Sequence, residues 1–178
     1  MNKKLKSALY YVCAAVLAIA IGLGVSHLIG QSKRSDLEGS AKDITVVSES
    51  GKAVKLSDFA GRPVVVNFFA TWCGPCKNEM PAFQSAYEEY GDEVVFLMVN
   101  LTGWEKVSQN KTDYVKGVIK GLGYSFPLYF DLADAASTAY GIEGVPLTLF
   151  INGKGEIVST YNGSMSKLKL ELYIKKIM

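Results

Sequence analysis

The hydrophobic pattern predicts an α/β domain built around two buried strands. Residues 64–70 and 94–100 are short, continuous apolar runs bounded by turn residues, as expected of strands covered on both faces. Between the two runs, apolar side chains recur at helical spacing at Phe83, Ala86, Tyr87 and Tyr90. The order strand, helix, strand predicts a parallel unit with a right-handed crossover.

Weaker patterns on either side complete the predicted domain, which covers residues 43–178. Alternating apolar positions over 44–56 predict an N-terminal β-hairpin, and a helical period predicts a helix over 111–122. A short strand at 126–130 and a short helix follow, the helix with Leu132, Ala135, Ala136 and Ala139 as its apolar positions. "LTLFI" and "EIVSTY", joined by Asn-Gly-Lys-Gly, predict a second hairpin, and the last helix has an apolar stripe at Leu170, Tyr173, Ile174 and Ile177. The result is a mixed central sheet flanked by helices on both faces.

The start of the chain has a different pattern. Residues 1–6 contain three lysines, and the uncharged run that follows is long enough, at about 1.5 Å per residue, to cross a hydrocarbon core of about 30 Å. We expect a cytoplasmic N-terminus at 1–6, a single transmembrane helix at 7–30 that anchors the chain, and a polar linker at 31–42. A cleavable signal peptide is the alternative, with a cleavage pattern at Ala18-Ile19-Ala20. Both interpretations place the folded domain on the extracytoplasmic side.

Charge and cysteine usage narrow the chemistry to a local site. Lys and Arg number 19 and Asp and Glu number 17, so the chain lacks the basic surface typical of nucleic-acid-binding proteins. Two of the three cysteines, Cys73 and Cys76, stand together, whereas Cys13 and the only histidine, His27, lie in the apolar N-terminal run. A structural zinc site needs about four ligands, so it is excluded, and we expect no metal and no bound cofactor.

The sequence Cys73-Gly-Pro-Cys76 lies where a predicted strand ends and a predicted helix begins. Unpaired N–H groups and the helix dipole at such a position stabilise a thiolate, so Cys73 is the expected attacking sulfur. Cys76 lies one helical turn later and can resolve a mixed disulfide. A passive structural disulfide is the alternative, but a loop this short contributes little by the chain-entropy account. The pattern therefore favours redox catalysis.

Glu79 follows Cys76 by three residues, which returns its carboxylate to the same helix face. If the side chain is partly buried, its pKa rises and it can exchange protons with Cys76. The other interpretation is an ordinary solvent-facing glutamate in an early helical turn, where the dipole favours a negative charge. Spacing alone leaves both interpretations open.

The segments "FFATWCGPCKNEMP" and "YGIEGVPLTLFINGKGEIV" resemble the thioredoxin superfamily. The apolar N-terminus and the longer central segment are similar to its membrane-tethered, extracytoplasmic TlpA/ResA-type branch. The resemblance implies a thioredoxin-like fold with four or five core strands, an insertion within 101–130, and a cis peptide bond before Pro146. It also implies that client proteins bind over Trp72, Gly74, Pro75, Val145 and Pro146.

Two comparisons with that branch refine the expected mechanism. Asn67 stands where cytoplasmic thioredoxins have a buried aspartate, so that proton acceptor is absent. ResA-like members instead have a glutamate three residues after the second cysteine, which Glu79 matches, and this favours a role for Glu79 as a proton carrier. Gly74 and Pro75 depart from the ResA-like pattern, because this dipeptide is typical of thioredoxins.

The predicted function is a membrane-anchored thiol-disulfide oxidoreductase that reduces disulfides or oxidised partner proteins outside the cytoplasm. Reduction there requires electrons passed through the membrane, so we expect a transmembrane thiol reductase as upstream partner. By family analogy the clients are apocytochrome c, methionine sulfoxide reductase, or sporulation or envelope proteins. The alternatives are an oxidant that forms disulfides, and a non-catalytic chaperone or peptide-binding module.

Overall fold

The computed structural model describes Val16 and residues 39–178. The predicted cytoplasmic N-terminus, the predicted anchor apart from Val16, and most of the predicted linker lie outside the described residues. Within the described part of the chain, no helix is long and apolar enough to cross a membrane. The chain divides into two units, residues 1–37 and residues 38–178, and the following description concerns the second unit.

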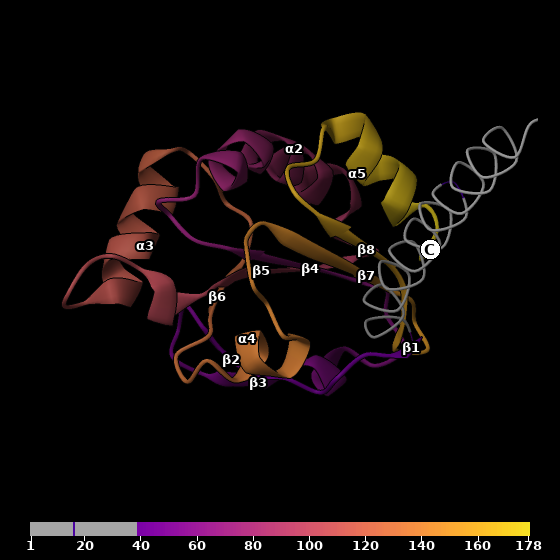
Figure 1. Ribbon diagram of the computed structural model, residues 1–178. Helices are drawn as coiled ribbons and strands as arrows, with labels where there is room; N and C mark the ends of the chain where they lie inside the picture. Colours follow the sequence, from indigo (N-terminus) through magenta and orange to yellow (C-terminus); the bar gives the residue numbers. More distant parts are fainter. Residues whose placement is uncertain (1–15, 17–38) are drawn as a thin grey trace, which may run out of the picture. The chain divides into compact units, whose positions relative to one another are not determined.

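One mixed sheet of eight strands forms the centre of the described domain (Figure 1). Its order is β1-β8-β7-β4-β5-β6-β2-β3. β4 pairs in parallel with β5, and β5 in parallel with β6, whereas the other neighbouring strands are antiparallel. The strands are β1 (Gly39–Ser40), β2 (Thr45–Ser48), β3 (Ala53–Lys55), β4 (Val64–Phe69), β5 (Val95–Asn100), β6 (Leu128–Phe130), β7 (Leu147–Ile151) and β8 (Glu156–Asn162).

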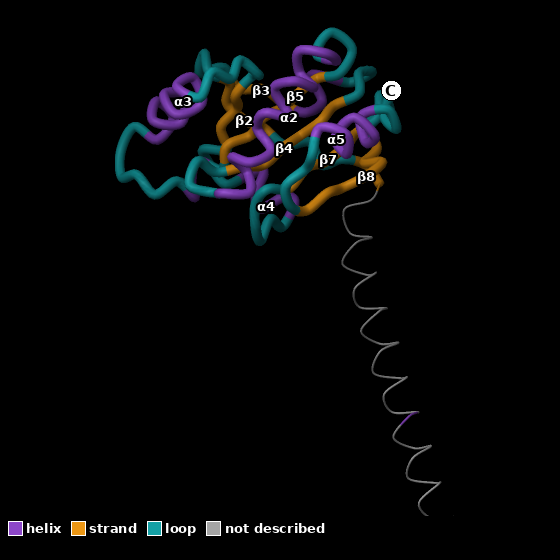
Figure 2. Tube along the Cα trace, turned by 90° about the horizontal axis from the view of Figure 1, so that it is seen from above, coloured by secondary structure: helices purple, strands orange, loops and turns teal. Residues whose placement is uncertain are grey.

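Helices cover both faces of this sheet, as the sequence predicts. Figures 1 and 2 show α2 and α5 side by side over one face, with α4 on the opposite face. The helical elements are η1 (Leu56–Phe59), α2 (Gly74–Tyr90), η2 (Thr102–Trp104), α3 (Lys111–Gly121), α4 (Ala135–Tyr140) and α5 (Lys167–Ile174). The predicted insertion therefore contains η2, α3 and β6.

The two-sided cover explains why β4 is apolar at nearly every position. Val65 and Phe69 point into the core shared with α2 and α5, where Phe83 and Ile174 are fully buried. Phe68 points to the other face, and its ring lies 5.8 Å from that of Tyr140 in α4. Because alternate side chains of a strand point to opposite faces, both faces of β4 must be apolar. Asn67 is the polar exception, and it lies on the α2 side.

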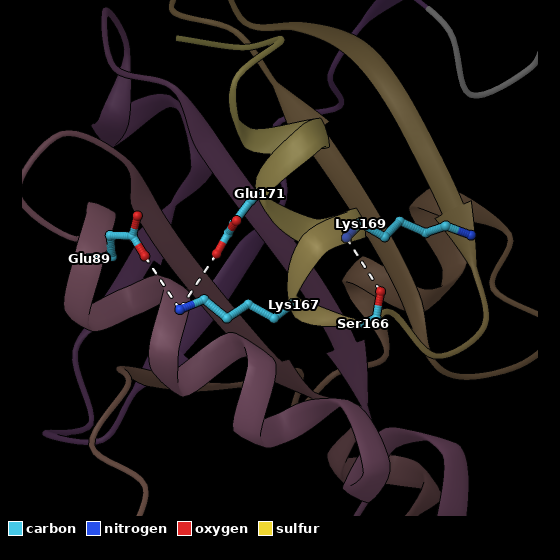
Figure 3. A network of polar contacts seen from close by, with 5 residues as sticks. All are labelled: Glu89, Ser166, Lys167, Lys169 and Glu171. Carbon is cyan, nitrogen blue, oxygen red and sulfur yellow. Dashed lines mark hydrogen bonds and ion pairs between the residues drawn. The ribbon is translucent and has the colours of Figure 1, made fainter.

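Packing rather than surface charge holds α5 against α2. Lys167 lies 3.6 Å from both Glu89 of α2 and Glu171 of α5 (Figure 3). The Lys167 and Glu89 side chains are about half exposed, and exposed ion pairs of this kind contribute about 0–1 kcal/mol. Ser166 caps α5 by accepting a hydrogen bond from the Lys169 N–H at 3.4 Å. Ile174 and Leu170, both fully buried, contribute the larger share of the stabilisation.

Three details differ from the prediction. The sheet begins at Gly39 and Ser40, residues assigned above to the linker, because β1 adds to the edge of β8. The sheet is larger than the four or five core strands expected, because the β2–β3 hairpin also joins it through β6. Leu132, predicted as an apolar position of the short helix, is 53% exposed. It precedes α4, whose N-cap Asp134 has φ 52°, so the helix starts later and buries Ala136 and Tyr140 instead.

Candidate redox site

The two cysteines lie at the carboxyl end of β4, where α2 begins. They form a disulfide with an S–S distance of 2.05 Å. Cys73 is the N-cap of α2, and its Sγ accepts a hydrogen bond from the Cys76 N–H at 3.1 Å. Gly74 and Pro75 occupy the first turn, where the missing proline N–H removes no helical hydrogen bond. The strand-to-helix junction predicted from the sequence is confirmed.

The surroundings of the pair differ from one sulfur to the other. Trp72, Gly74 and Pro75 are exposed and surround Cys73, which is itself 4% exposed. Cys76 is 1% exposed, and both cysteines belong to the apolar core, so the difference lies in the exposed residues next to Cys73. A protein that approaches over the three exposed residues therefore meets Cys73 first. The helix N-terminus favours the thiolate form of this residue once the disulfide is reduced.

Val145 and Pro146 lie beside the cysteines although about 70 positions separate them in the chain. The Val145 carbonyl oxygen is 3.5 Å from Cys73 Sγ, and the Val145–Pro146 peptide bond is cis. The Pro146 carbonyl accepts a hydrogen bond from the Gly163 N–H at 2.9 Å. The structure thus brings the Val145 carbonyl to the Cys73 sulfur, with Pro146 next to it in the chain.

Glu79 is buried, so the interpretation as a solvent-facing glutamate is wrong. Its side chain is 1% exposed and lies one helical turn after Cys76. One carboxylate oxygen accepts a hydrogen bond from Asn67 Nδ2 at 2.8 Å, and the other accepts one from the Met165 N–H at 3.0 Å. Burial raises the pKa of Glu79 from its ordinary value of 4.5 to about 7, although both hydrogen bonds oppose the rise. The acid can therefore gain or lose a proton near neutral pH.

Sequence reasoning singled out Asn67 but not its contact with Glu79, and it missed the other residues that hold this carboxylate in place. Asn67 also donates a hydrogen bond to Thr148 Oγ1 at 3.0 Å, from the antiparallel neighbour β7, where the two residues are directly opposite. Thr148 and Asn67 could have been found as the polar positions in two otherwise apolar strands. Met165 contributes through its backbone in the loop before α5, which leaves no signal in the sequence.

A second unpredicted contact involves the insertion. The Trp72 indole N–H donates a hydrogen bond to the Trp104 carbonyl at 2.8 Å. Lys106 Nζ lies 4.5 Å from the centroid of the Trp72 ring. The exposed ring next to Cys73 is therefore held from η2 and the residues after it.

No group of three or more His, Cys, Asp and Glu side chains in the described domain could hold a metal ion. The redox group of the site is the Cys73–Cys76 disulfide itself.

Residues 37–160 match the sequence profile of the AhpC/TSA family. The chain belongs to the AhpC/TSA family. This AhpC/TSA protein is similar to the thiol-disulfide oxidoreductase ResA of Bacillus subtilis, with 29% identity over 99% of this chain and 96% of that one. It is also similar to the thioredoxin-like protein YneN of the same organism, with 32% identity over 74% of each chain.

Solved structures agree with the family. The exposed lipoprotein thioredoxin Etrx1 of Streptococcus pneumoniae has a TM-score of 0.65 and 32% identity, covering 76% of this AhpC/TSA chain and 99% of that one. StoA of Bacillus subtilis has a TM-score of 0.63 and 28% identity, covering 74% and 96%. The fold is thioredoxin-like, and the family, the relatives and the Cys73–Cys76 disulfide agree on thiol-disulfide oxidoreductase activity.

Proposed function

We propose that this protein reduces disulfides of client proteins on the extracytoplasmic side of the membrane. One observation carries the proposal: a cysteine pair caps α2 with exposed residues around Cys73, while Cys76 and the acid Glu79 are buried behind it. The proposed catalytic residues are these three. The proposed client-binding surface consists of Trp72, Gly74, Pro75, Val145 and Pro146.

The first step is attack by Cys73. In the reduced protein its thiolate attacks one sulfur of a client disulfide, forms a mixed disulfide, and releases the other client sulfur as a thiolate. The Cys76 N–H, which already lies 3.1 Å from Cys73 Sγ, helps to stabilise the negative charge on the attacking sulfur. Gly74 and Pro75 are exposed and leave room for the client chain.

The second step needs a proton acceptor in an apolar place. Cys76 must lose its proton before it attacks Cys73 Sγ, closes the disulfide and releases the second client thiolate. Glu79, one turn away, has a pKa raised by burial to about 7, so its ionised form is present near neutral pH and can accept that proton. The client gains two electrons and two protons, and the protein returns to the disulfide form.

Reduction outside the cytoplasm requires a source of electrons, for which we propose a transmembrane thiol reductase. The apolar run at 7–30 supports a membrane anchor with the catalytic domain outside. The relative Etrx1 is described as an exposed lipoprotein. The resemblance to ResA-like proteins supports apocytochrome c, methionine sulfoxide reductase or another envelope protein as client, and the Gly-Pro dipeptide by analogy supports a reducing potential.

The deciding experiment measures the reduction potential of the pair in a fragment that starts at Ser32, equilibrated with glutathione or dithiothreitol buffers at pH 7. A reduction potential close to that of thioredoxin, about −270 mV, supports a reductase. A reduction potential close to that of DsbA, about −120 mV, would make the protein an oxidant that forms disulfides.

Cysteine variants distinguish catalysis from mere binding. Cys76→Ser should accumulate a mixed disulfide with its client on a non-reducing gel, whereas Cys73→Ser should form none and should lose turnover. In the full chain, Cys13→Ser is the matched control and should keep full turnover. Full activity in Cys73→Ser would support a non-catalytic chaperone or binding module instead.

A further inference from the structure

Three consecutive residues of the insertion contact the two residues that precede Cys73. Beyond the contacts of Trp104 and Lys106 with Trp72, Glu105 accepts a hydrogen bond from the Thr71 N–H at 2.7 Å. The segment 104–106 therefore holds Thr71 and Trp72 through a carbonyl, a carboxylate and an ammonium group. None of these contacts was predicted from the sequence.

Glu105 is the buried member of this segment. Its side chain is only 5% exposed. Besides the Thr71 N–H, it accepts hydrogen bonds from Thr71 Oγ1 at 2.5 Å and from Asn100 Nδ2 at 2.6 Å. Asn100 ends β5 and lies opposite Phe69, the last residue of β4. One carboxylate thus connects the ends of two parallel strands at the point where the chain turns toward Cys73.

The position of Trp72 depends on this connection. The residue is 42% exposed, so burial alone does not fix its ring. Without the Glu105 carboxylate, the Thr71 N–H and the Thr71 hydroxyl would lose this acceptor in a buried place, and Asn100 Nδ2 would keep only its 3.5 Å hydrogen bond to the Phe69 carbonyl. These losses are unfavourable for the observed loop conformation. A change in that loop moves Trp72 directly, because Thr71 and Trp72 are adjacent.

We propose that Glu105 is a positioning residue that holds Trp72 as a platform for protein disulfides. The inference rests on the proposed function, in which Trp72 belongs to the client-binding surface. Glu105 contacts neither cysteine, so it acts through Thr71 and Trp72. A protein client must contact the Trp72 ring, so its reduction depends on the position that Glu105 gives this ring. A small disulfide needs only the Cys73 sulfur, so its reduction does not depend on Glu105.

The test compares the two kinds of substrate in single turnover. The full chain in detergent micelles, in a Cys13→Ser background, is reduced, freed of reductant and mixed with insulin or with the small disulfide DTNB. Both reactions give a second-order rate constant for oxidation of the Cys73–Cys76 dithiol. With insulin, the remaining thiols are alkylated and counted after acid quenching at successive times. With DTNB, the absorbance of the released thiolate is followed directly. We expect Glu105→Ala to lower the insulin rate constant about tenfold and the DTNB rate constant less than twofold.

Two further variants keep the test decisive if Glu105→Ala folds poorly. Glu105→Gln retains the shape and part of the hydrogen bonding, so its insulin rate constant should lie between those of the parent and Glu105→Ala. Lys106→Ala removes only the exposed ammonium group above the Trp72 ring, and should lower the insulin rate constant about threefold without affecting the DTNB rate constant. Glu88→Gln, an exposed change on α2, is the control and should alter neither.

A fluorescence readout reports Trp72 itself. The chain has two tryptophans, and Trp104→Phe leaves Trp72 alone while retaining the carbonyl that accepts its N–H. In that background, Glu105→Ala should lower the emission anisotropy of Trp72, because the ring moves more freely. Equal losses on insulin and DTNB, or unchanged anisotropy, would overturn the positioning role. Failure of the parent protein to reduce insulin at all would instead refute the proposed function.

Discussion

Replacing Glu79 by glutamine should change how the stability of the oxidised protein depends on pH. Glu79 is buried, with its oxygens 2.8 Å from Asn67 Nδ2 and 3.0 Å from the Met165 nitrogen. Glutamine has the same shape and no charge. Its carbonyl can face the Met165 N–H, and its amide can face Asn67 if that side chain flips to present its own carbonyl. The variant therefore retains the packing and removes the ionisation; the flip also changes the hydrogen bond between Asn67 and Thr148, but that change does not depend on pH.

The sign and size of the effect follow from the pKa of Glu79. A carboxyl whose pKa is raised from 4.5 to about 7 binds its proton more tightly in the folded than in the unfolded chain. Its contribution to stability is therefore fully present below pH 4.5 and is lost as the pH rises through about 7. Since one pKa unit corresponds to about 1.4 kcal/mol, the loss is about 3 kcal/mol, to order of magnitude. Glu79→Gln avoids this loss.

Urea unfolding of the oxidised fragment from Ser32, at several values between pH 4 and pH 8, measures the effect. The quantity of interest is the unfolding free energy of Glu79→Gln minus that of the parent, because contributions from other carboxylates cancel in the difference. We expect this difference to rise by about 3 kcal/mol between pH 4 and pH 8. The matched control, Glu88→Gln, changes an exposed carboxylate of the same helix and should give a flat difference. A flat difference for Glu79→Gln would refute the argument from burial.

Two other substitutions test the surroundings of the site. Asn67→Ala removes the hydrogen bond to the ionised Glu79, so the pKa of Glu79 should move above about 7, and a fall in its carboxyl-carbon NMR titration midpoint would contradict this. Phe83→Ala should lower the unfolding free energy by about 3–5 kcal/mol because the ring is fully buried between α2 and the sheet. The exposed Leu168→Ala should stay within about 0.5 kcal/mol of the parent in the same urea titrations, and equal costs for the two would show that this core contributes little.

The central strands, their parallel pairing and the hairpins were predictable because periodicity and turn residues are local signals. β4, β5, β7 and β8 lie where the apolar runs place them. The start of α4 was not predictable in the same way. Leu132 has the right spacing for a buried position, but the backbone at Asp134 has a positive φ, and no apolar pattern encodes that turn. The two-residue strand β1 was missed because Gly39 and Ser40 are small, exposed residues that carry no apolar pattern.

At the site, the sequence revealed the reactive groups but not what surrounds them. The Cys73-Gly-Pro-Cys76 pattern is local and specific, and its position at a helix N-terminus could be predicted from the flanking residues. Burial of Glu79 could not, because it depends on α5 and the loop at Met165, which are about 90 positions away in the chain. The role inferred for Glu105 was equally hidden, since a single acidic residue in a polar loop carries no pattern of its own.

Asn67 shows how the buried polar groups of the site depend on one another. An amide at this position donates hydrogen bonds to both Glu79 and Thr148. An aspartate, which the resemblance places here in cytoplasmic thioredoxins, would put a second carboxyl at hydrogen-bond distance from Glu79. Two carboxylates so close in a buried place cannot both be ionised, and one pKa would rise strongly. A single buried acid near Cys76 therefore requires a neutral donor on β4, so the proposed proton acceptor Glu79 on α2 and the asparagine on the strand form one unit.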